Sequence, residues 1–483
     1  MTNDLPDRIA TRPAPDRPAA HRGNPRTTLA LISVAGLLVS LTQSLLIPVL
    51  PTLTASLHTS TTNAEWLLTS TLLVAAVAVP VVGRLADLFG KKRLLVFTLA
   101  AFVAGSLLCA LSNSLGALIV GRAVTGLSMA AIPLGISLVS ATLPPERARS
   151  GIALISAMLG IGGALGLPLA GAIAEHANYH ILFWICVAGG GVCLAGTAYF
   201  VPEAPILARG KMDVGGSVLL GAALITLLLP LSEASVWGWG DPKTLGLLAA
   251  AVVLFAVFAV VERRRASPVV DLRVNARPAL LLTNLASVAV GFALFAILLG
   301  TASYVQAPPS SGYGFGSSIL VSGLCLLPSG VFMLLMSLVS PKISARFGPK
   351  ITLALGAAIV GLGFIERIVL TGQLWQVVLG TTLAGMGTGI AYAAMPSLIL
   401  LAAPRSELAA ANSLNSLARS VGSSLAAALG GTILAASLIT VGGYALPSLS
   451  AYRMLFAVCA GAAFLGAAIS LCIPASPPPR SDQ

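Results

Sequence analysis

One aspartate stands among cations between two long apolar stretches, and its type and spacing favour an electrostatic contact over bond-making chemistry. The run from Gly83 to Arg93 reads Gly-Arg-Leu-Ala-Asp-Leu-Phe-Gly-Lys-Lys-Arg. In a chain with only 9% charged residues, Asp87 is the single carboxylate beside four cations, so we expect it to be ionised and paired. A carboxylate of this kind stabilises a helix N-terminus by about 0.3 to 2 kcal/mol. The alternative interpretation is a topology anchor with no moving part.

A second candidate is an arginine inside an apolar run. Arg122 stands in the sequence Gly-Arg-Ala-Val-Thr-Gly, several residues after the run begins near residue 115. A guanidinium within a membrane is costly and is kept where it meets water, a partner or a substrate. An arginine near the outer edge, with its head group reaching the surface, is the alternative.

Small residues mark a third region. Gly162 and Gly166 form a G-x-x-x-G pattern, followed by Pro168 and Gly171. Glycines at this spacing let two membrane helices approach closely, and the proline removes one backbone hydrogen bond and bends its helix. The glycines alone also fit ordinary helix packing.

Polar residues near the carboxyl end share one helix face. Asn412, Asn415 and Arg419 are three and four residues apart, so they point the same way. A polar stripe in a membrane helix faces either a cavity or another helix, and we favour the cavity. Thr42 and Gln43 are two further candidates for a cavity lining.

The elements that must position these residues are membrane-spanning helices. The chain has 483 residues, 57% of them hydrophobic, and apolar runs of about 20 residues recur along nearly its whole length. Backbone groups in lipid must bond within their own segment, so these runs are predicted to be helices, for example over 64–83 and 94–112. We count fourteen such runs, which predicts an all-α integral membrane protein.

The charge distribution predicts the orientation of the spans. The net charge is +12, but the cations are scattered through short loops, which excludes a nucleic-acid interface. Most of the 28 Lys and Arg residues fall in the two tails and in alternate loops. The positive-inside rule therefore predicts that both tails are cytoplasmic.

A weak internal repeat predicts how the helices are grouped. The segment 341–350 matches 83–92, with Gly348 under Gly90 and Ala345 in place of Asp87. The second copy comes eight spans after the first, two more than a pair of six-helix halves would require. The predicted parts are a disordered tail (1–27), an amino-terminal half (28–201), two inserted helices with linkers (202–278), a carboxyl-terminal half (279–473) and a short tail (474–483).

The layout G-x-L-x-D-x-x-G-[KR]-[KR]-[KR] over 83–93 resembles the signature loop of the major facilitator superfamily. Fourteen spans grouped as six, two and six resemble its drug:proton antiporter-2 family, of the EmrB/QacA type. The resemblance implies a gating motif in which Asp87 meets the start of span 13, where Ser406 is a candidate cap. The members of that motif would be Gly83, Asp87, Gly90, Lys91, Lys92 and Arg93.

The same resemblance gives roles to two other motifs. The run around Arg122 is similar to a span-4 motif whose arginine takes part in proton coupling. Gly162, Gly166, Pro168 and Gly171 resemble a span-5 motif of exporters, although Leu167 here separates the second glycine from the proline.

One departure from the family pattern concerns the proton carrier. Most members carry an acid in span 1, where this chain has Thr42, with Ile47 at the position of a usual asparagine. The remaining acids near spans lie close to outer ends: Glu65, Glu175, Glu233 and Glu366. Glu65, beside Trp66, is our first candidate for proton coupling, and an ordinary interfacial anchor is the alternative.

These observations predict proton-driven efflux of lipophilic or amphipathic small molecules by alternating access. The alternative is a lipid or solute transporter without tight proton coupling. An enzyme is not expected, because the chain has no H-E-x-x-H, G-x-S-x-G, Walker or C-x-x-C motif. We expect a monomer that crosses the inner (cytoplasmic) membrane many times. Its partners would be a small-molecule substrate and membrane lipids, with the proton gradient as energy source and with no cofactor, metal or nucleic acid.

Overall fold

The computed structural model describes residues 24–46, 49, 53–54, 56–208, 210–265 and 267–474. Within these ranges the chain is mostly helical, and fourteen helices are long and apolar enough to cross a membrane. The all-α membrane fold predicted from the sequence is therefore confirmed. The predictions for most of the two tails lie outside the described residues, as does Ile47.

The amino-terminal half contains six spans, the fourth of which is interrupted by a 3-10 turn. Its elements are α1 (Pro25–Ser44), α3 (Thr61–Phe89), α4 (Lys91–Leu111), α5 (Leu115–Gly126), η1 (Leu127–Ala130), α6 (Ala131–Thr142), α7 (Pro145–His176) and α8 (His180–Phe200).

Two helices and a short turn of helix separate the halves, and six further spans with a hairpin complete the chain. These elements are α9 (Val214–Trp237), α10 (Pro242–Arg263), α11 (Leu272–Asn275), α12 (Pro278–Gln306), η2 (Pro309–Ser311), α13 (Ile319–Phe347), α14 (Pro349–Val369), α15 (Leu374–Ala402), η3 (Arg405–Glu407), α16 (Leu408–Ala436), β1 (Leu438–Val441), β2 (Tyr444–Pro447) and α17 (Leu449–Leu471).

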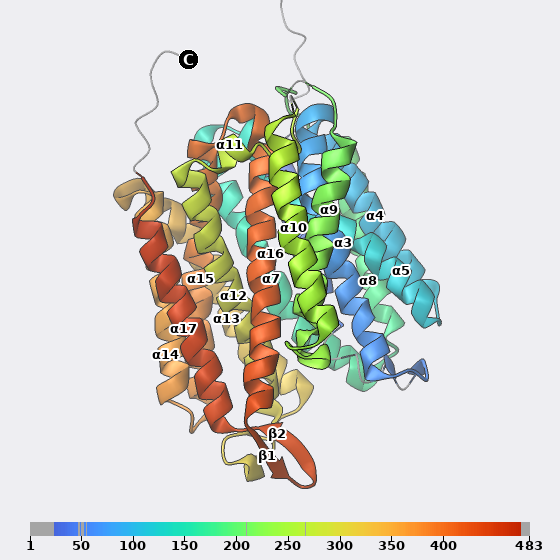
Figure 1. The fold of residues 1–483 in the computed structure, drawn as a ribbon, viewed down its shortest axis with the longest axis vertical. Helices are drawn as coiled ribbons and strands as arrows, with labels where there is room; N and C mark the ends of the chain where they lie inside the picture. The colour runs from blue at the N-terminus through green and yellow to red at the C-terminus, as the bar shows by residue number, and fades with distance from the viewer. Residues whose placement is uncertain are drawn as a thin grey trace, which may run out of the picture.

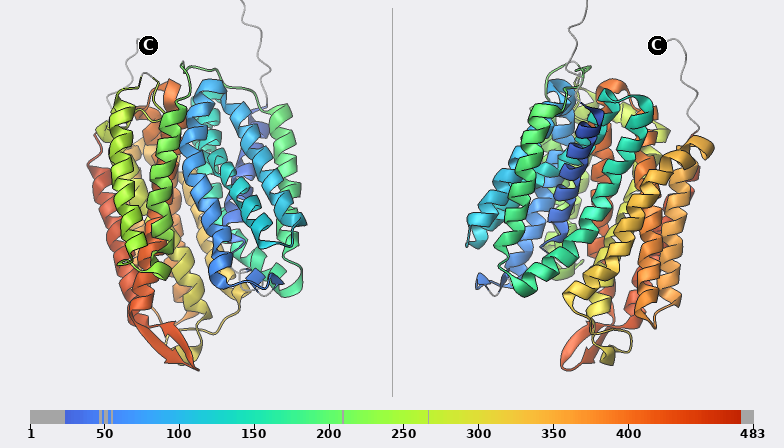
Figure 2. Two further views of the ribbon diagram at one scale, coloured as in Figure 1. Left: turned by 45° about the vertical axis from the view of Figure 1, so that its right-hand side comes forward. Right: turned by 180° about the vertical axis from the view of Figure 1, so that it is seen from behind.

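Each half has its own hydrophobic core. One core is built almost entirely from residues between 32 and 204, and the others in the second half from residues between 286 and 473 with a single contribution from α7. Figure 2 shows the two halves side by side, blue to teal and yellow to red. Helices α3 and α7 of the first half pack on α16 and α13 of the second. A further cluster joins Ala76 of α3 to Leu417 and Ala428 of α16 through residues of α9. The halves therefore meet through a few helices, and each also keeps a core of its own.

The inserted helices α9 and α10 lie outside both halves, and α9 contacts each of them. They pack against one another, and α9 also packs on α3 and α16, as Figure 1 shows on the near face of the bundle. The indole Nε1 of Trp239 donates a hydrogen bond to Thr432 Oγ1 on α16 at 2.7 Å. The helix pair α9 and α10 thus covers the line along which α3 and α16 meet.

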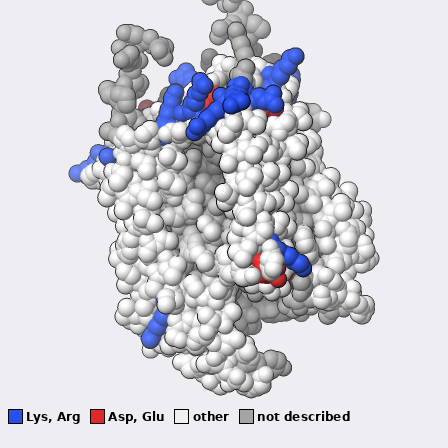
Figure 3. Space-filling model, in the orientation of Figure 1, with Lys and Arg blue, Asp and Glu red and all other residues white. Residues whose placement is uncertain are grey.

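The two ends of the bundle differ in charge. Lys and Arg side chains gather at the end where α11 lies (Figure 3), and the strands β1 and β2 project from the opposite end (Figure 1). The strands pair antiparallel from Leu438 opposite Pro447 to Val441 opposite Tyr444. Gly442 and Gly443 both have positive φ, 58° and 83°, as a two-residue hairpin turn requires. Sequence reasoning did not predict this hairpin.

The charged run at 83–93 is helical except at one residue. The sequence predicts a loop between spans that end near 83 and begin near 94, but α3 continues to Phe89 and α4 begins at Lys91. Gly90 alone separates them, with φ 112°. The loop prediction was wrong because the charged residues lie on two helices that extend beyond the apolar runs. The repeat has the same form, since only Gly348, φ 84°, separates α13 from α14.

We predict that Gly90→Ala destabilises the protein by about 1 to 3 kcal/mol, because its backbone conformation strains any residue with a side chain. A Cβ there would also approach the Glu203 carboxylate at 2.9 Å. The measurement is the thermal unfolding midpoint of the purified protein in detergent.

Gly246→Ala is the matched control, because a Cβ at Gly246 in α10 meets nothing within 4 Å. An equal midpoint for Gly90→Ala and Gly246→Ala would contradict the prediction.

Candidate functional site

The Asp87 carboxylate bonds to the N-terminus of a helix in the other half. Its Oδ1 accepts from the Ala409 amide at 3.3 Å, and its Oδ2 accepts from the Ala410 amide at 2.9 Å. Lys91 Nζ lies 2.9 Å from Oδ1, and both side chains are buried. A buried carboxylate is tolerated only with such partners. The contact expected between Asp87 and the start of this helix is therefore present, and its role as a gate stays a prediction.

Asp87 supplies the cap that the local sequence of α16 lacks. The residue at the N-cap position is Glu407, and its side chain makes no capping hydrogen bond. Ser406, the cap candidate from the sequence, lies inside η3 and not at the cap position. The unpaired amides of the first turn and their partial positive charge are thus satisfied across the interface between the halves.

Gly83 brings the two helices together at this point. A Cβ on Gly83 would meet the side chain of Ser413 and would lie 3.0 Å from the carbonyl oxygen of Ala409. Next to it, Ser137 Oγ of α6 donates to the Leu408 carbonyl at 3.2 Å. Asn412 Nδ2 lies 3.4 Å from Ser137 Oγ. The cation-rich end is therefore closed between α3, α6 and α16.

Two later residues of the charged run, Lys92 and Arg93, contact a different carboxylate. The Lys92 and Arg93 amides donate to the Glu203 carboxylate at 2.8 and 3.3 Å, so Glu203 caps α4. The Lys92 side chain is half-buried and that of Arg93 is exposed. Sequence reasoning missed Glu203, although an acid just after an apolar run, at the same membrane end as the start of α4, is the signal that could have found it.

Arg122 is buried within the amino-terminal half, with 1% of its surface exposed. Its Nε donates to the Leu67 carbonyl and its Nη1 to the Thr42 carbonyl, both at 3.3 Å. This burial excludes an arginine whose head group reaches the membrane surface. The guanidinium instead connects α5 to Leu67 of α3 and to Thr42 of α1. Thr42 is the position at which the resemblance places an acid.

The two candidate cavity residues of α1 have different surroundings. Thr42 Oγ1 donates to the Leu38 carbonyl at 2.8 Å and lies 3.3 Å from Cys186 Sγ on α8. Its side chain therefore packs between helices in this structure, and the cavity assignment for Thr42 stays a prediction. Gln43 is half-buried, and its Nε2 lies 3.0 Å from Met129 Sδ.

The glycine motif of α7 packs on helices of both halves. A Cβ on Gly162 would lie 2.6 Å from the Leu37 carbonyl oxygen, and one on Gly166 would lie 3.0 Å from that of Leu41, both on α1. On the other side, Gly171 lies against the start of α13, and Gly323 of α13 lies against Pro168. The motif thus permits close contact between α7 and its neighbours on both sides, while its exporter role stays a prediction.

The polar stripe of α16 lies against other helices. Asn415 Nδ2 donates to Asn284 Oδ1 at 3.0 Å and to Ser287 Oγ at 2.7 Å, both on α12. Arg419 Nη1 donates to Asn415 Oδ1 at 2.6 Å, and its guanidinium lies 5.0 Å from the ring centre of Tyr392 on α15. These contacts favour the helix-packing alternative over the cavity that we expected for Asn415 and Arg419.

Glu65 lies close to a second carboxylate. It is half-exposed at the start of α3, and the charge of Glu65 acts on Glu233 of α9. Glu233 is buried, and Thr69 Oγ1 lies 3.4 Å from its Oε1. The role of Glu65 in proton coupling stays a prediction. The side chain of Glu175 lies outside the described residues.

These features define the class of the protein, a polytopic helical membrane protein whose two six-helix halves are joined by a capped helix end. The family model of the Major Facilitator Superfamily matches residues 32–329 and 313–483. The chain therefore belongs to the Major Facilitator Superfamily, and it is a multi-pass membrane transporter and not an enzyme.

Curated relatives of this chain are named for the export of antibiotics and for multidrug resistance. The tetracenomycin C resistance and export protein of Streptomyces glaucescens is 31% identical over 80% of this chain and 72% of its own length. The multidrug resistance protein Stp of Mycobacterium tuberculosis is 28% identical, covering 85% and 76%. The cephamycin export protein CmcT of Amycolatopsis lactamdurans is 30% identical, covering 71% of each chain.

A solved structure shares the fold. The crystal structure of the human organic anion transporter MFSD10 superposes with a TM-score of 0.63. It covers 92% of this chain and 99% of its own, at 16% sequence identity. At this identity the likeness supports the fold alone.

We predict that Asp87→Ala opens the cation-rich end. The change removes hydrogen bonds to a charged group, each worth about 1.5 to 3 kcal/mol, so the open state should gain at least about tenfold in population. Ser413 is fully buried at this crossing, so a cysteine there reports on opening. The measurement is the rate at which Ser413→Cys reacts with a membrane-impermeant maleimide from that side.

Cys472, the exposed native cysteine among those described, is replaced by serine in the background. Glu146→Ala is the control, because Glu146 is an exposed acid in the first turn of α7. Labelling that is equally slow in both variants would show that Asp87 does not hold this end closed.

Proposed function

We propose that the protein exports lipophilic or amphipathic small molecules in exchange for protons, by alternating access across the inner membrane. The observation that carries this proposal is the Asp87 carboxylate at the N-terminus of α16, which joins the two halves at one end of the bundle. The relatives named for export of tetracenomycin, cephamycin and drugs support the substrate class.

The joined end fits an alternating-access gate. The contact consists of hydrogen bonds between polar groups at a crossing where Gly83 leaves no side chain in the way. Its strength, of the order of a few kcal/mol, is enough to favour one state of a two-state equilibrium without locking it. Separation of α3 from α16 would then open this end, and re-formation of the contact would close it.

The orientation follows from the charge of the same end. Lys and Arg side chains gather there (Figure 3), and cytoplasmic loops are enriched in these residues. The Asp87 contact would then close the cytoplasmic side, and the hairpin β1–β2 would lie outside the cell. The state described here would be closed toward the cytoplasm.

The proton-coupling part of the proposal rests on Arg122. Its guanidinium is fully buried and keeps one nitrogen, Nη2, without a hydrogen-bond partner among the described residues. An arginine so placed draws anionic or carbonyl oxygen toward it. We assign it the role of the group that responds to substrate and proton, which is the role that the family resemblance implies.

Transport without tight proton coupling is the second candidate function, with a lipid or other solute as the substrate. One observation favours it: at the position where the resemblance places the span-1 acid stands Thr42, whose hydroxyl is bonded to its own helix.

We predict that Asp87→Asn and Arg122→Ala each abolish resistance that the wild-type protein confers. The host is an efflux-deficient strain, and the readout is the minimum inhibitory concentration across a panel of amphipathic antibiotics. Lys243→Ala, which changes an exposed cation in the first turn of α10, serves as the control and should keep resistance. Unchanged resistance in both site variants would contradict the mechanism, provided that membrane levels are equal.

We expect an uncoupler to stop substrate accumulation in inverted vesicles that contain the wild-type protein, because the proton gradient would be the energy source. Vesicles with Arg122→Ala provide the background rate. Accumulation that persists with the uncoupler present would favour the second candidate function.

A further inference from the structure

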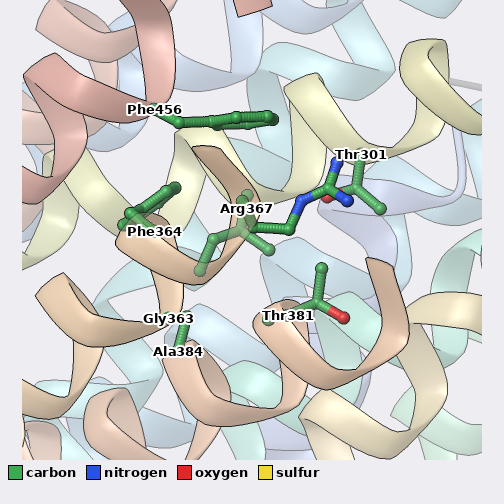
Figure 4. Close-up of a pocket in the computed structure, with 9 residues that line it drawn as sticks. Thr301, Gly363, Phe364, Arg367, Thr381, Ala384 and Phe456 are labelled. Atoms are coloured by element: carbon green, nitrogen blue, oxygen red, sulfur yellow. The ribbon is translucent and has the colours of Figure 1, made fainter. Parts of the chain in front are cut away.

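Two charged residues lie in α14 of the carboxyl-terminal half, one of them buried and the other half-buried. Glu366 and Arg367 are neighbours near the end of α14, at the end of the bundle where the hairpin lies (Figure 1). Arg367 is only 2% exposed. Its guanidinium carbon lies 4.7 Å from the ring centre of Tyr304 and 4.8 Å from that of Phe456. Figure 4 shows the side chain directed between α12, α15 and α17 rather than toward the surface.

Both charged groups lack hydrogen-bond partners. The buried Nε, Nη1 and Nη2 of Arg367, and both buried carboxylate oxygens of Glu366, have none among the described residues. The pocket that Arg367 lines has no room for the centre of a water molecule. A water in this pocket therefore cannot satisfy the Arg367 guanidinium. An enclosed polar group left in this way carries a large desolvation penalty.

The two side chains meet this penalty differently. A guanidinium keeps its proton in proteins, and the two ring faces stabilise its charge. A carboxylate can instead become neutral by binding a proton, which a site without donors favours. The geometry of this state therefore suits a protonated Glu366 beside an Arg367 that the aromatic rings hold.

The space for this arrangement comes from Gly380 on α15. A Cβ at Gly380 would meet Glu366 Oε2, and it would lie 2.7 Å from both Cγ and Cδ of Arg367. Any larger residue there would push the pair apart.

The charged and titratable groups around the pair come from three of the helices that pack on α14. Tyr304 of α12, Cys325 of α13 and Tyr452 of α17 act on Arg367, and Arg453 of α17 acts on Tyr304. Gly380 and Thr381 are what α15 contributes to the lining. Among the described residues, Glu366 is the one carboxylate whose charge acts on Arg367.

We propose that Glu366 is the proton-binding group on the hairpin side of the exchange, and that Arg367 is its alternate partner. This proposal rests on the proton exchange proposed above. When the carboxylate binds a proton from that side, Arg367 remains over the rings of Tyr304 and Phe456. When the carboxyl releases the proton, its negative charge pairs with Arg367 and draws it from the rings. The repacking of α14 against α12 and α17 then shifts the carboxyl-terminal half from one of its two states toward the other.

The test is transport by the wild-type protein and Glu366→Gln in proteoliposomes of uniform orientation. The substrate is a labelled compound that the resistance panel has identified. The pH is varied on the hairpin side and fixed on the other side. Wild-type transport should change with that pH, by at most about tenfold per pH unit for one proton. Glu366→Gln should lose this dependence while substrate-for-substrate exchange, which moves no proton, stays within about twofold of wild type.

Glu366→Asp and Glu146→Gln complete the transport test. Glu366→Asp keeps a carboxyl group and should keep a pH response with a shifted midpoint, and Glu146→Gln should behave as wild type. A wild-type protein without any response to the proton gradient would overturn the proposed antiport. A wild-type response that persists in Glu366→Gln would overturn only the assignment of Glu366.

An infrared titration of the purified protein gives a readout that does not depend on transport. The wild-type carbonyl band of a protonated carboxylic acid should include a component that is absent in Glu366→Gln and retained in Glu146→Gln. If Glu366→Gln fails to fold, the same comparison is made with Glu366→Asp, whose component should shift. A spectrum identical to that of the wild type in every variant would overturn the proposal.

Discussion

The contact between the two halves depends on a single buried carboxylate that caps a helix from outside its own chain segment. Helix α16 begins with amides that its own N-cap residue does not satisfy, and Asp87 of α3 supplies the missing acceptor. The cost of burying that carboxylate is offset by Lys91 and by the partial charge of the helix end. Without the other half, the first amides of α16 would lack this acceptor and the Asp87 carboxylate would lack these donors. Both groups are satisfied only when the halves meet.

Close approach of helices is the second condition of this arrangement. Gly83 at the α3–α16 crossing, and Gly162 and Gly166 at the α1–α7 crossing, each stand where a side chain would collide with a neighbour. Membrane helices gain little from hydrophobic contact with one another, because lipid tails are equally apolar, so dispersion contacts at short range must hold them. The glycines determine which helices come that close, and thus where polar groups of different halves can meet.

The fold could be predicted from the sequence further than the site could. Runs of about 20 apolar residues specify helices because a bilayer allows few alternatives, so the fourteen spans and the repeated motif were accessible. The Asp87 contact was accessible only through the resemblance to a known family. For Thr42, Asn415 and Arg419 the cavity lining stays a prediction, because a periodic pattern gives the face of a helix but not what packs on that face. Glu203 and Arg367 were missed, since the partners that enclose them come from distant segments.

The inserted helices α9 and α10 affect the route by which a lipophilic molecule could reach the interface between the two halves. They lie along the seam between α3 and α16 and are fastened to the second half through Trp239 and Thr432. Acyl chains of the bilayer meet this pair of helices before they meet the seam. On that flank the opening proposed between α3 and α16 would therefore be shielded from lipid. A compound dissolved in the membrane would have to enter by another side or from the aqueous phase.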